Sequence, residues 1–129
     1  MKNIIIDCDT GQDDAISIIF GIASKKVNII GITTVGGNSN VENCTVNTLK
    51  ILEFMKVNNI PVYKGEQKPL YKELKTLECV FGESGMAGAD DLPFPKLKEE
   101  NIKAKEFIKD IFSKNNNIEI CATAPMTNI

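Results

Sequence analysis

Four aspartates lie within a short stretch near the amino terminus of this 129-residue chain: Asp7, Asp9, Asp13 and Asp14. They follow three consecutive isoleucines, which are typical of a buried strand, and the sequence from Asp13 onward has the apolar spacing of a helix. The four carboxylates are therefore expected at one strand-to-helix turn, at the edge where open α/β sheets bind ligands. Carboxylates packed this closely repel one another, so either some stay protonated or a cation lies among them. A hard metal ion is the simpler explanation.

The rest of the sequence alternates between strand and helix patterns. Strands are predicted over residues 2–7, 27–35, 61–63 and 117–122, and helices over 13–24, 41–56 and 99–114. This order predicts an α/β fold, with a mostly parallel, Rossmann-like, doubly wound sheet and helices on both faces. Residues 65–95 have no clear period, and such long segments usually serve as lids or binding loops. The sheet is expected to be truncated after its fourth main strand, which would leave that strand with an open edge.

Composition narrows the class of protein. The net charge of −2 argues against a nucleic-acid partner, which usually needs a basic face. The chain has no histidine and no CxxC pair among its four cysteines, which excludes an ordinary zinc site and indicates reduced thiols in a cytoplasm. Cys8 and Cys121 lie in or beside predicted strands and are expected to be buried. No apolar run approaches the roughly 18 residues of a membrane span, so the prediction is a soluble cytoplasmic protein without a membrane partner.

Helix capping and a phosphatase site are the two alternatives to a metal site at the aspartate turn. Aspartates cap helices and are favourable in a first helical turn, which accounts for Asp13 or Asp14 but not for Asp7 and Asp9. The pair Asp7 and Asp9 also resembles the strand end of haloacid dehalogenase-type phosphatases, which use magnesium. That family usually places Thr or Val where this chain has Gly11, and it does not need the later aspartates.

Four ordered segments resemble one known family. Residues 7–15 (DCDTGQDDA) are similar to the calcium-binding signature DxDPGxDDA of the inosine-uridine preferring nucleoside hydrolases. Residues 33–38 (TTVGGN) resemble the family's second-strand signature, residues 82–86 (GESGM) resemble its HGESGL loop, and residues 123–129 (TAPMTNI) resemble its TGPLTNI segment. The resemblance covers the chain from end to end, so residues 1–129 are expected to form the amino-terminal part of such a domain, with 65–95 as a loop or lid.

The resemblance implies a metal site and a reaction. Family members hydrolyse the N-glycosidic bond of ribonucleosides to ribose and free base, in nucleoside salvage. By resemblance, Asp9 would bind Ca²⁺ and act as the general base on a water molecule. Asp14 would be a bidentate ligand and the backbone carbonyl of Thr123 a third protein ligand, a set of oxygen donors that suits Ca²⁺. Asp7 would support the metal site without binding the ion itself.

Two residues would contact the ribonucleoside. Asp13 would accept a hydrogen bond from a ribose hydroxyl, and Asn38 would hold the ribose or orient Asp9. Asn38 has an alternative role, because it could instead cap the helix that begins near Val41 or hold a turn.

The chain also departs from the family pattern. Phe81 replaces a histidine that contacts substrate in the pyrimidine-handling members, so it would either stack on a base or pack in its loop. Thr10 replaces a proline, which is expected to cost little beyond turn rigidity. Family members are more than twice as long, and the absent part carries a further aspartate ligand and groups that hold the ribose.

The sequence therefore predicts an incomplete nucleoside hydrolase. The alternative is a non-catalytic truncated domain that binds a cation or associates with itself through its open strand and an exposed segment 127–129. A homo-oligomer is a further expectation from the resemblance.

Overall fold

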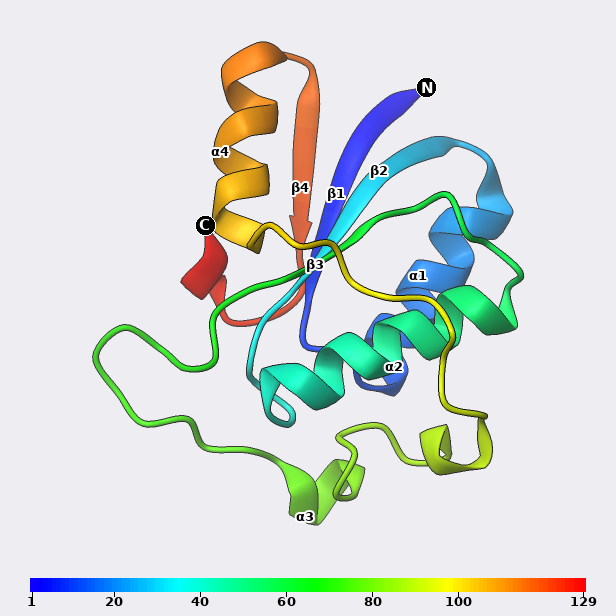
Figure 1. The fold of residues 1–129 in the computed structure, drawn as a ribbon, viewed down its shortest axis with the longest axis vertical. Coiled ribbons are helices and arrows are strands. Elements are labelled where there is room, and N and C mark those ends of the chain that lie inside the picture. Colours follow the sequence, from blue (N-terminus) through cyan, green and yellow to red (C-terminus); the bar gives the residue numbers. More distant parts are fainter.

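The computed structural model describes residues 1–129 and contains one four-stranded sheet with the strand order β3-β2-β1-β4 (Figure 1). The strands are β1 (Lys2–Cys8), β2 (Val27–Thr34), β3 (Val62–Lys64) and β4 (Ile118–Ala122). All three pairings are parallel, so the carboxyl ends of the strands meet at one edge of the sheet. The predicted parallel α/β sheet is confirmed.

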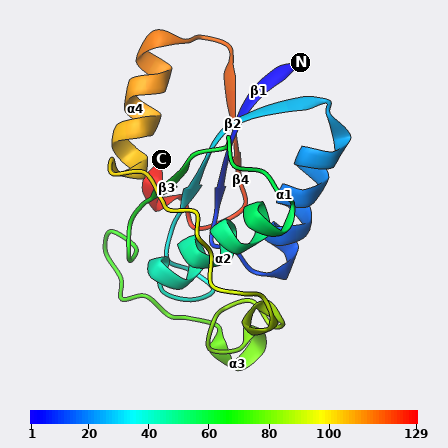
Figure 2. The ribbon, with the colours of Figure 1, turned by 45° about the vertical axis from the view of Figure 1, so that its right-hand side comes forward.

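Three main helices cover both faces of this sheet. Helices α1 (Gln12–Ser24) and α2 (Val41–Phe54) pack on one face, and α4 (Ala104–Lys114) packs on the other (Figure 2). Between β3 and α4 the chain contains only two short turns of helix, α3 (Glu78–Phe81) and η1 (Ala89–Asp91), which agrees with the predicted long loop. A final 3₁₀ turn, η2 (Met126–Asn128), follows β4. None of the helices combines the length and apolar character that a membrane crossing would require.

Helix α4 begins at Ala104, later than the predicted residue 99. The preceding residues make tertiary contacts that a helix would forbid. The backbone N–H of Glu100 donates to the carbonyl of Val62 at 2.8 Å, and Glu99 forms an ion pair with Lys64 at 3.1 Å. The segment before α4 is therefore held beside β3, and the helix starts only when it leaves that strand.

Strand β1 is packed on both faces, because neighbouring side chains of a strand point in opposite directions. Ile6 and Cys8 belong to the apolar cluster under α1 and α2, whereas Ile5 belongs to the cluster under α4. In the second cluster the rings of Tyr63 and Phe107 are stacked with their centroids 3.9 Å apart. This double packing fixes the end of β1, from which the aspartates emerge.

Strand β4 is the edge strand and is much less covered. Cys121 pairs in register with Ile6, yet its side chain is exposed, so the prediction that Cys121 is buried was wrong; the same prediction for Cys8 is confirmed. No helix covers this face of β4, and Ile16 and Phe20 of α1 are also exposed, at 67% and 72%. The sheet thus has an open edge at β4, and α1 has an uncovered apolar face.

Candidate functional site

Three of the four aspartates are buried at the carboxyl end of β1. Asp7, Asp9 and Asp14 are almost fully covered, and Asp13 is exposed. The residue at the N-cap of α1 is Gly11, and no side chain caps that helix. Helix capping therefore does not explain the aspartates, although Asp13 and Asp14 lie in the first turn, where negative charge is favourable.

Asp7 has no exposed surface and has one satisfied and one unsatisfied carboxylate oxygen. Its Oδ1 accepts hydrogen bonds from the Thr33 hydroxyl and from Asn128 Nδ2, the latter at 2.8 Å. Its Oδ2 is buried without a partner. Burial raises the pKa of Asp7, and the two hydrogen bonds act against that rise. The hydrogen bonds to Asp7 thus connect the end of β1 to β2 and to the carboxyl-terminal turn.

Asp14 shows the same pattern and is joined to Thr123. Its Oδ1 accepts a hydrogen bond from the Thr123 hydroxyl at 2.6 Å, and its Oδ2 is buried without a partner. Burial, together with the charges of Asp9 and Asp13, raises the pKa of Asp14 to about 6. The backbone N–H of Thr123 donates to the Asp7 carbonyl at 2.9 Å. Residues that are far apart in sequence thus meet at the carboxyl end of β1.

Asp9 is held by the turn that follows β2. The backbone N–H of Asn38 donates to Asp9 Oδ2 at 2.8 Å, and Asn38 Nδ2 reaches the Asp9 carbonyl at 3.3 Å. A side chain at Gly37 would overlap the Asp9 carboxylate, so the close approach of this turn requires glycine. Burial raises the pKa of Asp9, and the hydrogen bond from Asn38 opposes that rise.

Asn38 does not cap a helix. The N-cap of α2 is Asn40, whose side chain accepts a hydrogen bond from the Asn43 backbone at 2.8 Å. The prediction that Asn38 caps this helix was therefore wrong; Asn38 lies in the bend after β2, where it contacts Asp9.

A cavity of about 750 Å³ opens beside Asp9. Its inner side contains Asp9, Asn38 and Pro125, and its outer wall comes from residues 69–77. Asp13 and Phe81 do not line it; Asp13 is exposed on α1 and Phe81 is half-buried in α3. The structure therefore brings Asp9 and Asn38 to the cavity, whereas Asp13 lies outside it.

The Gly-Glu-Ser-Gly loop is anchored to the aspartate turn by α2. Asn47 Nδ2 donates both to the Thr10 carbonyl at 3.1 Å and to the Ser84 carbonyl at 2.8 Å. The buried Thr10 hydroxyl lies 2.7 Å from that of Thr48, so replacing proline by threonine at this position adds a hydrogen bond to α2. Sequence reasoning missed Asn47, Thr48 and Asn128, although buried polar residues on the inner face of a helix are a usable signal.

The site offers few atoms that could bind a metal ion, but these atoms are oxygens, which suit a hard cation. Two anionic oxygens, Asp7 Oδ2 and Asp14 Oδ2, are buried without hydrogen bonds, and such orphaned groups often indicate an ion. No three cysteine, aspartate or glutamate side chains are arranged as a ready-made metal cluster. The residues present therefore fit an oxygen-ligated metal ion whose remaining ligands would be water, substrate or further protein groups.

Comparison with known proteins assigns the family. The family model described as inosine-uridine preferring nucleoside hydrolase matches residues 4–129. The chain belongs to this family. Among curated relatives of this nucleoside hydrolase chain, the pyrimidine-specific ribonucleoside hydrolase RihA of Salmonella arizonae is 38% identical over 127 residues. That alignment covers 98% of this chain and 40% of the relative.

Solved structures agree with the sequence comparison. The purine-preferring ribonucleoside hydrolase from Gardnerella vaginalis superposes with a TM-score of 0.90 and 31% identity, covering 98% of this chain and 42% of its own. The plant nucleoside hydrolase PpNRh1 superposes with a TM-score of 0.88 and 34% identity, covering 98% of this chain and 41% of its own. The nucleoside hydrolase chain described here thus spans about 40% of the length of these relatives. The family match also argues against the phosphatase alternative.

Proposed function

We propose that this chain carries the metal-binding and water-activating part of a calcium-dependent ribonucleoside hydrolase. The reaction is hydrolysis of the N-glycosidic bond to ribose and free base, as used in purine and pyrimidine salvage. The observation that carries the proposal is the pair of buried carboxylates, Asp9 and Asp14, of which Asp9 lines a cavity of about 750 Å³. Burying such a pair is costly unless a cation compensates for the charge.

The metal ligands in this proposal are the carboxylates of Asp9 and Asp14 and the backbone carbonyl of Thr123. Support comes from the unpartnered Oδ2 of Asp14 and from the 2.6 Å hydrogen bond that holds Thr123 against that carboxylate. Ca²⁺ takes six to eight oxygen ligands, so these three residues leave positions for water and substrate. When bound, the ion would lower the pKa of a water molecule and fix its orientation.

Asp9 is the proposed general base. Burial raises its pKa, which makes the carboxylate a stronger base towards water. The hydrogen bond from the Asn38 backbone fixes one of its oxygens and thereby orients the carboxylate at the cavity. Asp13, at the exposed start of α1, would accept a hydrogen bond from a ribose hydroxyl. Asn38 would contact the ribose from the cavity wall.

A second function is favoured by a separate observation. β4 is the edge strand, and Cys121 and Ala122 on it are exposed. The alternative is a cation-binding domain without turnover. It could associate with a second copy through β4.

The deciding experiment measures ribose release from inosine and uridine with added Ca²⁺ and with a chelator. Release that needs Ca²⁺ and is lost in Asp9→Asn would support the hydrolase. The matched control is Asp90→Asn, which changes an exposed aspartate in η1. Release that survives chelation, or that Asp9→Asn leaves unchanged, would contradict the proposal. Calcium binding that Asp14→Asn abolishes, without any ribose release, would support the second function.

A further inference from the structure

Asn128 is a buried polar residue with hydrogen bonds at both ends of its amide. Only 3% of its surface is exposed. Its Nδ2 donates to Asp7 Oδ1 at 2.8 Å and to the Thr34 carbonyl at 2.9 Å. Its Oδ1 accepts a hydrogen bond from the Glu66 backbone at 2.9 Å. One side chain therefore joins the ends of β1 and β2 to the segment that follows β3.

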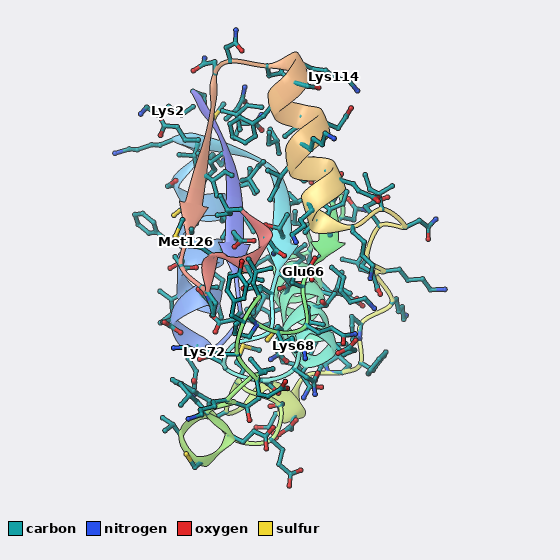
Figure 3. All side chains as sticks on the ribbon, turned by 90° about the vertical axis from the view of Figure 1, so that its left-hand side faces the viewer. Lys2, Glu66, Lys68, Lys72, Lys114 and Met126 are labelled. Atoms are coloured by element: carbon teal, nitrogen blue, oxygen red, sulfur yellow. The ribbon has the colours of Figure 1, made fainter.

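The backbone closes tightly around this amide. A methyl group at Gly65 would overlap both the Asn128 amide and the Thr34 carbonyl. The Gly65 N–H itself donates to that carbonyl at 2.9 Å. Figure 3 labels Glu66 and Met126 at this junction, where the carboxyl-terminal turn meets the chain leaving β3. Asn128 thus occupies a space that is shaped by glycine and has little room for water.

The segment that ends at Asn128 begins at Thr123, and both ends are attached to Asp7. The Thr123 N–H donates to the Asp7 carbonyl, and Asn128 donates to the Asp7 carboxylate. Between these attachments, Pro125 lines the cavity beside Asp9. Residues 69–77, which form the far wall of the cavity, come soon after Glu66 in the chain, so the contact of Glu66 with Asn128 holds the start of that wall.

We propose that Asn128 is a positioning residue that sets the backbone of Thr123 and the spacing of the cavity walls. It acts through Asp7 and Glu66 and touches neither substrate nor metal. The effect on metal affinity rests on the proposed calcium site, whereas the effect on the Thr123 backbone does not. Mutation of residues that orient metal ligands without binding the metal typically lowers the metal affinity by about 10-fold to 100-fold.

The test compares three variants of the 129-residue chain with the parent. Asn128→Ala removes all three hydrogen bonds of the side chain. Gly65→Ala disturbs the same contact without changing Asn128. Met126→Ala is the matched control, because Met126 lies in the same turn and is 66% exposed. The measurements are amide hydrogen exchange without metal and the Ca²⁺ dissociation constant by calorimetry.

Asn128→Ala and Gly65→Ala should accelerate exchange at Thr123 and Glu66 while the Ile5 amide in β1 keeps its protection. Both should weaken Ca²⁺ binding about 10-fold or more, and Met126→Ala should change neither measurement. Asn128→Asp keeps the acceptor for Glu66 but loses the donors to Asp7 and to the Thr34 carbonyl. In that variant only Thr123 should exchange faster, with weaker Ca²⁺ binding.

Unchanged exchange at Thr123 in folded Asn128→Ala or Asn128→Asp would overturn the proposal. If Asn128→Ala does not fold, the Gly65→Ala and Asn128→Asp variants decide by the same criterion. If the parent chain binds no Ca²⁺, the proposed metal site fails, while Thr123 exchange still decides the positioning role of Asn128.

Discussion

The two neighbours of strand β1 differ sharply. On one side, β2 pairs with β1 from Lys2 to Cys8, and its residues Ile32, Thr33 and Thr34 have no exposed surface. On the other side, β4 pairs with β1 over a shorter stretch, and Cys121 and Ala122 are exposed. The same strand therefore separates a fully packed half of the sheet from an open edge.

The two halves hold their site residues by hydrogen bonds in different surroundings. Asp9 follows β1 and is held by hydrogen bonds from Asn38, which lies in the turn between β2 and α2. Thr123 and Asn128 follow an exposed strand and are positioned by hydrogen bonds to Asp7, Asp14 and Glu66. Asp9 is 7% exposed whereas Thr123 is exposed, so water competes more readily for the hydrogen bonds of Thr123. The metal site is thus expected to be less robust on its β4 side.

Thiol labelling offers the largest contrast between the halves. Cys79 and Cys121 are exposed, whereas Cys8 and Cys44 are buried, and burial raises the pKa of Cys44 to about 12. Because the thiolate is the reactive form, a thiol reagent should label two cysteines of the native chain quickly and the other two only after unfolding. Counting modified cysteines by mass spectrometry, with Cys121→Ser for assignment, checks this. Rapid labelling of all four would contradict the packing described for β1 and α2.

Core truncation should also distinguish the halves. Ile32→Ala removes a fully buried side chain of β2 and should lower the free energy of unfolding by about 2–5 kcal/mol. Ile120→Ala on β4 changes a half-buried side chain and should cost less than half as much. Urea unfolding of both variants measures the difference. Equal losses would mean that β4 is as well packed as β2.

The metal-free chain should lose stability as pH rises through the acidic range. The pKa of Asp14 is about 6 in the folded chain against 3.8 for the ordinary group, so the folded state binds its proton more tightly. The stability that this proton adds is fully present below pH 3.8. It is lost as the pH rises through about 6, a loss of about 3 kcal/mol. Ca²⁺ should restore stability mainly above pH 6, where the carboxylate is ionised.

Urea melts between pH 4 and pH 8, with chelator and with Ca²⁺, measure this dependence. Asp14→Asn, which cannot ionise, should flatten it. A metal-free chain whose stability rises over the same range would contradict the assignment.

The smallest effect concerns the exposed face of α1. Phe20 is 72% exposed, so Phe20→Gln should change the free energy of unfolding by less than about 0.5 kcal/mol. Ile18→Gln is the control, because Ile18 is fully buried on the opposite side of the same helix and should cost several-fold more. A loss of more than about 1 kcal/mol in Phe20→Gln would show that something covers this face. Size-exclusion chromatography of the two variants would then test whether a second copy does so.

Much of this fold could be predicted from local patterns. Isoleucine-rich runs located β1 and β2, and apolar spacing located α1 and α2 within two residues of their observed ends. Helix α4 was predicted too long because Glu99 and Glu100 make tertiary contacts with β3, and a periodic pattern carries no information about such contacts.

The site was predictable in part. The aspartates and Asn38 were found from motifs, and the structure places Asp9, Asp14 and Thr123 together. Segment 127–129 was expected to be exposed, and for Asn128 this was wrong, since its amide is buried among the strand ends. The exposure of Cys121 was missed because burial of an edge strand depends on what covers it.

The sequence alone determined which residues can do chemistry and which segments are strands or helices, because both depend on residue type and short-range spacing. It also determined the family, because four motifs occur in the required order. Only the tertiary structure decided that Asp7 is held by Thr33 and Asn128, that Asn38 orients Asp9, and that one side of β1 is packed while the other is open. Those features depend on contacts between residues as far apart as Asp7 and Asn128, which form only when the parallel strands bring their ends to one edge of the sheet.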